Sequence, residues 1–148
     1  MEGALITRVL VDTSVYIALL RDRAFALDFR PWYEVGLART YMSSVVVQEL
    51  LAGAWTARER RQASELYEPF ERVRRVVTPT HELWKDAGTL IALMSRHVPR
   101  LGSRVRGGLL SDLLVALTAR SIGATVVTRN RRDFELINDF RPFRLHVV

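Results

Sequence analysis

The chain has 148 residues, 49% of them hydrophobic, and a formal net charge of +6 at pH 7. It contains no cysteine, which excludes disulfides and thiolate metal sites and fits a reducing compartment, so we expect a cytoplasmic protein. No uninterrupted apolar run is long enough to span a membrane, and Glu2 with the short apolar stretch after it is not typical of a signal peptide. We therefore expect one α/β domain over residues 1–148, with no membrane contact.

The first half of the chain alternates β-rich runs with helical patterns. Thr7 to Val11 predicts a strand that ends at Asp12, and Thr13 or Ser14 is placed to cap a helix directly after it. Within Ala24 to Thr40 we expect a helix that starts after Pro31 and packs through Trp32, Val35 and Leu37. A strand is expected at Tyr41 to Ser43, followed by a helix that Ser44 caps and that carries Glu49. A charged helix is expected at Ala57 to Val73, and Pro69 should kink or divide it.

The second half continues the same alternation. Val76 and Val77 predict a third strand, and Thr80 caps a long amphipathic helix with Leu83, Ala87, Leu90 and Met94 on its apolar face. The remaining expected elements are a mobile, arginine-rich loop at Pro99 to Gly108, a helix from Leu113 to Ile122 that Ser111 caps and Gly123 ends, a buried parallel strand at Ala124 to Thr128, and a last strand at Arg144 to Val148. This order predicts a central parallel β-sheet flanked by helices on both faces.

Acidic residues follow or flank the ends of several predicted strands. If the helix that starts near Ser111 runs antiparallel to the strand Ala124 to Thr128, then Asp112, Asn130 and Asp133 converge at one edge of the sheet. Taken singly, each acid has a structural explanation, because carboxylates at helix starts are common and stabilising.

Taken together, the acids indicate a different role. Asp12, Glu49, Asp112 and Asp133 in one cleft would repel one another, so that at least one pKa should rise, and a divalent cation would relieve the repulsion. Glu49 lies among apolar residues, so it either reaches solvent or meets a cation. Oxygen ligands without cysteine or a histidine pair suit Mg²⁺ or Mn²⁺ better than Zn²⁺.

Three stretches of the sequence carry a family resemblance. VLVDTSVYI, SSVVVQELLAG and SDLLVALTARSIGATVVTRNRRDF together resemble the PIN-domain ribonucleases, and among them the VapC toxins of toxin–antitoxin pairs. The resemblance implies a catalytic, metal-binding set of acids supported by three polar residues: Asp12, Glu49, Asp112 and Asp133, with Thr13, Thr128 and Asn130. It also implies hydrolysis of RNA phosphodiesters with Mg²⁺ or Mn²⁺, a cognate antitoxin that covers the cleft, and a homodimer.

Almost all of the positive charge comes from arginine, whose planar guanidinium group suits phosphate. The candidates for RNA contacts are Arg100, Arg104, Arg106, Arg129, Arg131 and Arg132. The alternative is that they are exposed loop charges or contacts to a protein partner. By the same resemblance, the helix Ala57 to Val73 and the first two helices are candidates for the antitoxin groove. For the whole chain, the alternative function is a PIN-like RNA-binding or protein-interaction module without nuclease activity.

Overall fold

A central parallel sheet organises the structure. The computed structural model describes residues 7–148, and of residues 106 and 107 it describes the backbone alone. Within this part of the chain, five strands pair in the order β3-β2-β1-β4-β5, and every pairing is parallel. The strands are β1 (Arg8–Val11), β2 (Thr40–Ser43), β3 (Val76–Val77), β4 (Ala124–Thr128) and β5 (Arg144–Val147). The parallel α/β sheet predicted from the sequence is confirmed.

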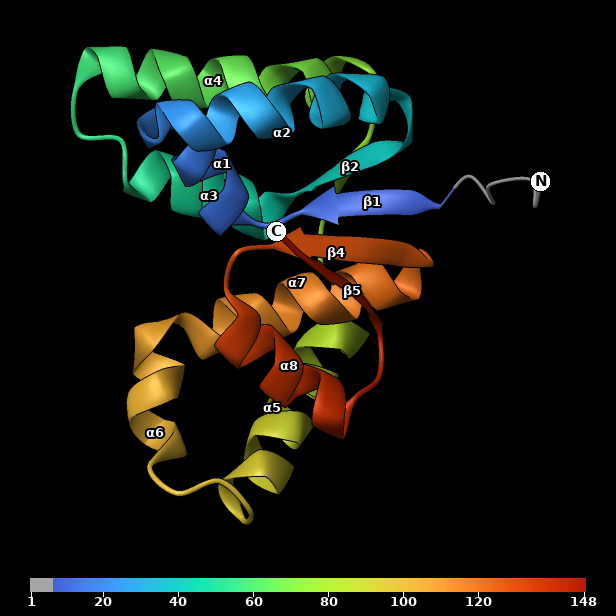
Figure 1. The fold of residues 1–148 in the computed structure, drawn as a ribbon. Coiled ribbons are helices and arrows are strands. Elements are labelled where there is room, and N and C mark those ends of the chain that lie inside the picture. The colour runs from blue at the N-terminus through green and yellow to red at the C-terminus, as the bar shows by residue number, and fades with distance from the viewer. Residues whose placement is uncertain (1–6) are drawn as a thin grey trace.

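Helices cover both faces of this sheet (Figure 1). On one face lie α1 (Thr13–Arg21), α2 (Arg23–Val35), α3 (Ser44–Ala52) and α4 (Ala57–Arg72). On the other lie α5 (His81–Ser95), α7 (Leu110–Ser121) and α8 (Arg131–Phe140), with the short α6 (Leu101–Arg104) at one end of this layer. A 3-10 turn at Leu37–Arg39 and a π turn at Val105–Leu109 complete the described helices. None of the helices within residues 7–148 has the length and apolar character needed to cross a bilayer.

The core fixes the two strands that lead into the acidic edge. β1 and β4 pair with Val11 opposite Val127, and both side chains are fully buried. Burying a side chain of this size stabilises the fold by about 1.5–3 kcal/mol. The backbone N–H of Asp12 donates to the carbonyl of Val127 at 2.9 Å, so the residues after both strands meet at the same edge of the sheet.

Helix α7 is buried along most of its length, from Leu113 to Ala119. The sheet lies on one side of it, and α5 and α8 lie beside it. Because the helix is enclosed in this way, Asp112 in its first turn is held in place at the acidic edge. The predicted end of the helix is confirmed, since Gly123 follows it with φ of +67°.

The helix caps predicted at Ser44 and Ser111 are wrong, and at the first helix the cap is Asp12, one of the acids with a structural explanation at a helix start, in place of Thr13 or Ser14. Asp12 caps α1 by accepting from the N–H of Ser14, and Ser43 caps α3 by accepting from the N–H of Val45. Each of these two caps is the last residue with an extended backbone before its helix, so each lies at least one residue earlier in the chain than the predicted cap. Ser111 caps nothing, because α7 continues from a preceding π turn through Leu109 in helical geometry.

Two prolines interrupt the helices less than predicted. Pro31 lies inside α2, which begins at Arg23, and Pro69 lies inside α4, which remains one helix. A proline removes one helical hydrogen bond, and the buried Phe29 and Phe70 anchor the two helices beside it. Val35 was expected to pack, but it is 87% exposed.

The segment from Pro99 to Gly108 is largely helical, so its prediction as a loop is wrong. It forms α6 and then a π turn that leads into α7. Leu101 and Leu109 are buried and anchor the two ends of this segment. Gly108 has a positive φ, at +110°, and produces a kink between this segment and α7.

Candidate active site

Asp12 is the most buried of the four acids, with 3% of its surface exposed. Its Oδ2 accepts hydrogen bonds from the hydroxyls of Ser14 at 2.8 Å and Thr128 at 2.9 Å. Burial raises the pKa of Asp12, although these hydrogen bonds oppose the rise. The carboxyl group is therefore fixed in orientation by neutral donors.

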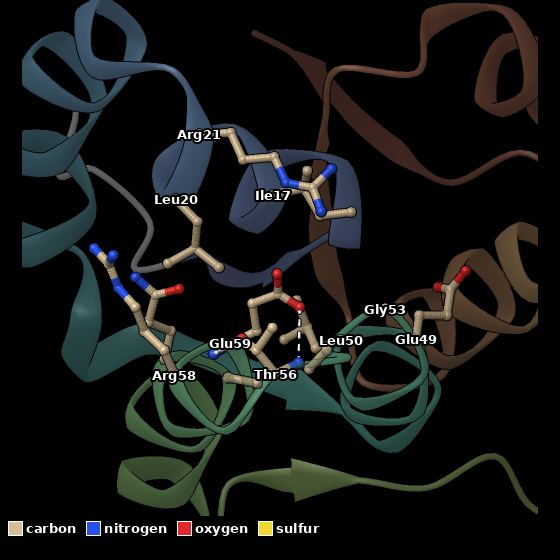
Figure 2. A pocket seen from close by; sticks show the side chains of 12 residues that line it. Ile17, Leu20, Arg21, Glu49, Leu50, Gly53, Thr56, Arg58 and Glu59 are labelled. Atoms are coloured by element: carbon tan, nitrogen blue, oxygen red, sulfur yellow. Dashed lines mark hydrogen bonds between the residues drawn. The ribbon is translucent and has the colours of Figure 1, made fainter.

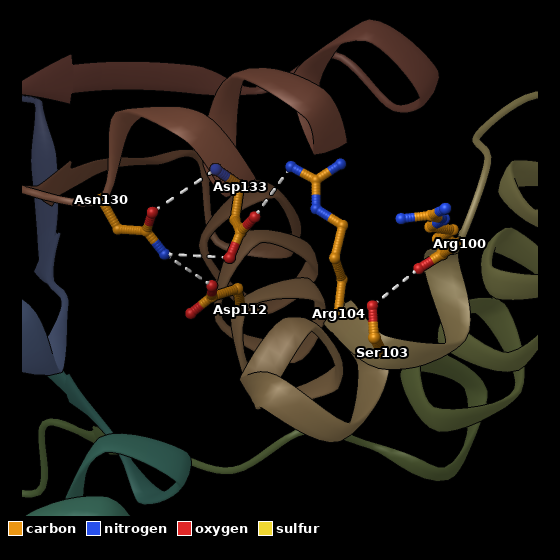
Figure 3. A network of polar contacts seen from close by, with 6 residues as sticks. All are labelled: Arg100, Ser103, Arg104, Asp112, Asn130 and Asp133. Atoms are coloured by element: carbon orange, nitrogen blue, oxygen red, sulfur yellow. Dashed lines mark hydrogen bonds and ion pairs between the residues drawn. The ribbon is translucent and has the colours of Figure 1, made fainter.

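Asn130 joins two further acids (Figure 3). Its Nδ2 donates to Oδ2 of Asp112 at 3.0 Å and to Oδ2 of Asp133 at 3.3 Å. Its Oδ1 accepts from the N–H of Asp133, so Asn130, and not Asp133, caps α8. The predicted convergence of Asp112, Asn130 and Asp133 is thus observed.

Glu49 reaches the same region from α3. The hydroxyl of Thr13 donates to its Oε1 at 2.8 Å. Burial raises the pKa of Glu49, and the charge of Asp12 raises it further, whereas the Thr13 hydrogen bond lowers it. Of the two interpretations of Glu49 from the sequence, the structure agrees with the first, because the carboxylate is half-buried and partly reaches solvent while it accepts a hydrogen bond from Thr13.

Asp112 shows how closely the four acids lie. Its pKa is raised from 3.8 to about 8, first by burial and then by the charges of Asp12, Asp133 and Glu49, while the Asn130 hydrogen bond lowers it. A carboxyl group in this position holds its proton near neutral pH unless a cation is present.

The acids of the site supply oxygen ligands only. Carboxylates with no sulfur ligand suit a hard cation such as Mg²⁺ or Mn²⁺, and such a cation would offset both the burial of Asp112 and the charges of Asp12, Asp133 and Glu49, which together raise its pKa. The chemistry therefore fits. Within residues 7–148, however, no three acids or histidines are arranged so that they could hold a metal ion. The acids lie close together without forming a ready coordination shell.

One polar residue of the site was assigned only a capping role from sequence. Besides its bond to Asp12, the Ser14 hydroxyl lies 3.2 Å from the Thr128 hydroxyl and accepts from the N–H of Arg129 at 3.0 Å. Ser14 therefore ties the end of β1 to the end of β4. The sequence feature that could have indicated a role for Ser14 in the site is its position two residues after Asp12, close to the end of a predicted strand.

The candidate arginines differ in their surroundings. Arg104 forms an ion pair with Asp133, Arg131 forms one with Glu135, and Arg129 lies over the ring of Phe25 at 4.5 Å. Arg100 and Arg132 are exposed. The side chain of Arg106 lies outside the described residues. Arg129 also forms an ion pair with Asp22 at 3.9 Å. The exposed arginines remain accessible to an anionic ligand, although Arg129 and Arg131 already pair with acids, whereas Arg104 is engaged within the protein.

A groove of about 480 Å³ lies between α1, α3 and the start of α4, and of the four acids Glu49 lines it. Figure 2 shows Glu49 at one end of this groove and Leu20 and Arg58 at the other. Ile17 and Leu20 on α1 are exposed apolar side chains of its wall. The groove thus leads from an apolar surface toward the acidic site.

Fold and site together define a parallel α/β protein with an acidic cluster at the carboxyl edge of its sheet. The sequence model of the PIN domain matches residues 9–139, and the chain belongs to the PIN domain family.

Its relatives include Ribonuclease VapC1 of Haemophilus influenzae strain R2866, which is 23% identical over 132 residues that cover 89% of this chain and 93% of the relative. Among solved structures, DNA-bound VapBC from Salmonella typhimurium is similar with a TM-score of 0.67 and 21% identity, covering 95% of this chain and 98% of that one. VapBC-1 from nontypeable Haemophilus influenzae has a TM-score of 0.61 and 19% identity, with the same coverage. These structures share the fold of this chain.

Proposed function

We propose that this protein is a Mg²⁺- or Mn²⁺-dependent endoribonuclease and the toxin of a toxin–antitoxin pair. The observation that carries the proposal is the convergence of acids from distant parts of a PIN-domain chain, in which hydroxyls orient Asp12 and Asn130 binds both Asp112 and Asp133. The relatives named as ribonucleases and the VapBC complexes support it.

In this proposal each polar residue of the site has a defined role. Asp12 and Asp112 hold the cation most directly, while Glu49 and Asp133 complete its oxygen environment. Asn130 fixes the orientation of two carboxylates, a type of contact that tunes metal sites strongly. When bound, the cation supplies positive charge that stabilises the phosphate in the transition state and favours deprotonation of water. Arg129, Arg131 and Arg132, which follow β4, bind and orient the RNA backbone.

Cleavage of RNA by the purified protein tests this function. We expect cutting with Mg²⁺ or Mn²⁺ and none with excess chelator. Asp12→Asn should abolish cutting, whereas Asp28→Asn, at an exposed acid on α2, should leave it unchanged. Binding of RNA by the wild-type protein without metal-dependent cleavage would support the binding-module alternative instead.

We further propose that the cognate antitoxin occupies the groove beside Glu49. The apolar walls on α1 and the charges of Arg58 and Glu59 suit a peptide segment of mixed character. The apolar face of α4 itself turns inward, with Ala63 and Phe70 buried, so it serves the core more than a partner. A homodimer is part of the same proposal, since the resemblance to VapC toxins implies one.

Leu20→Asp should weaken antitoxin binding at least about tenfold, because it places a charge in the apolar wall of the groove. RNA cleavage should stay within about twofold of wild type. Titration of the antitoxin by calorimetry measures the effect. Leu93→Asp is the matched control, since Leu93 is exposed to nearly the same degree as Leu20 but lies on α5, on the opposite face of the sheet. Equal weakening by both variants would contradict the placement.

A further inference from the structure

Arg104 reaches from α6 into the acidic cluster. Its Nη2 donates to Oδ1 of Asp133 at 3.1 Å, and the two side chains are only 19% and 21% exposed. Figure 3 shows Arg104 on one side of Asp133 and Asn130 on the other. A charge-assisted hydrogen bond at this depth is screened less by solvent than a surface ion pair.

With this contact, both carboxylate oxygens of Asp133 accept a hydrogen bond from a side chain. Arg104 binds Oδ1, and Asn130 binds Oδ2. Among the side chains described for residues 7–148, Asp133 is the one acid of the four with an ion-pair partner. Both carboxylate oxygens of Asp133 are therefore already hydrogen-bonded within the protein.

The ion pair is incompletely satisfied on the arginine side. Within the described residues, Nε of Arg104 is buried and has no hydrogen-bond partner. A buried donor left unpaired is unfavourable, so this arrangement gives up part of the stability that a fully bonded arginine would contribute. Such a contact can be exchanged for a better one at lower cost than a saturated bridge.

The segment that carries Arg104 is distinct from the helix that carries Asp112. Gly108 leaves the helical conformation between them, with φ of +110°. Arg104 therefore belongs to α6, before the π turn, and not to the enclosed body of α7. A change in the position of Arg104 does not require Asp112 to move with it.

We propose that Arg104 is a positioning residue that serves as the internal counter-cation of Asp133 in the metal-free protein and competes with the divalent ion for this carboxylate. The inference rests on the proposed function and concerns regulation of the same site. Binding of the metal requires the Arg104–Asp133 pair to separate, which lowers the apparent affinity for the ion. Once released from Asp133, the guanidinium group is free to bind an anionic group such as an RNA phosphate at the edge of the acidic cluster.

Titration of the purified protein with Mn²⁺ by calorimetry, in the absence of RNA, tests the proposal. Arg104→Met removes the charge but keeps most of the side-chain volume, and we expect Mn²⁺ to bind about tenfold more tightly, because a nearby positive charge is removed. Arg104→Lys, which keeps the charge, should bind Mn²⁺ within about threefold of wild type. Arg100→Met is the matched control, with the same loss of charge at an exposed position before α6.

The outcomes separate this inference from the proposed function. Unchanged or weaker Mn²⁺ binding by Arg104→Met, with a wild-type protein that binds Mn²⁺ and cleaves RNA, would overturn the competition alone. Failure of wild type and variants alike to bind Mn²⁺ would overturn both. Arg104→Gln provides a second neutral variant, and thermal melting verifies that each protein is folded. A role in phosphate binding alone predicts weaker RNA binding with unaltered Mn²⁺ affinity.

Discussion

Asp112→Asn is expected to reduce RNA cleavage by about a thousandfold and, without metal, to make the folded protein more stable than wild type. The loss of activity follows from the removal of a carboxylate from the proposed cation site, where charge stabilisation is worth several kcal/mol. The gain in stability follows from the raised pKa of Asp112, because the ionised carboxylate is buried beside three other acids. Activity and stability should therefore change in opposite directions.

The two measurements are the cleavage rate with saturating Mn²⁺ and urea unfolding in the presence of chelator at pH 8. Asp139→Asn, at an exposed acid of α8, is the matched control and should alter neither quantity. If Asp112→Asn instead lowers stability together with activity, Asp112 acts chiefly through its place at the start of α7.

The metal-free wild-type protein should lose stability as the pH rises from 5 to 9. The pKa of Asp112 is 3.8 in ordinary surroundings and about 8 in the folded protein, so from pH 5 up to the folded pKa the folded protein keeps a proton that the unfolded chain has already lost. The stabilisation is complete below the unfolded pKa and is lost as the pH rises through the folded one. Burial raises the pKa of Asp12 and Glu49 as well, so they act in the same direction.

The difference in unfolding free energy between Asp112→Asn and wild type isolates this contribution. We expect it to grow by roughly 2–4 kcal/mol between pH 5 and pH 9, less than the full shift in pKa would give because solvent still reaches the carboxyl group. Added Mg²⁺ should reduce the difference by stabilising the wild-type protein. A difference that stays constant with pH would show that Asp112 ionises normally in the folded state.

Strands and helices whose apolar pattern is local and periodic can be predicted from this sequence. The apolar runs of β1 and β4 are typical of strands buried on both faces, and their ends at Asp12 and Thr128 were placed correctly. The meeting of Asp112 with Asn130 also follows from sequence, because a helix that packs antiparallel to the next strand returns its start to the end of that strand.

Other features depend on tertiary packing and carry no local signal. Arg104 and Asp133 are 29 positions apart and lie on different elements. The chain contains many other arginines and acidic residues, so the sequence does not indicate that these two form an ion pair. The glycines and proline of Pro99 to Gly108 indicate a loop, yet buried Leu101 and Leu109 hold most of this segment in helical turns. The helix predicted to start after Pro31 begins at Arg23 for the same reason, since the packing of the buried Phe29 outweighs the one hydrogen bond that Pro31 removes.

The hydrogen bond between Asp12 and Thr128 also bears on the order in which the protein gains activity. These residues are 116 positions apart, and β1 pairs with β4 across the whole intervening chain. Contacts of such long sequence separation form late, after the loop between them has closed. A chain still in synthesis, with β4 not yet emerged from the ribosome, therefore has Asp12 but lacks the strand that holds its carboxyl group. The topology of the sheet delays formation of the proposed active site until β4 has paired with β1.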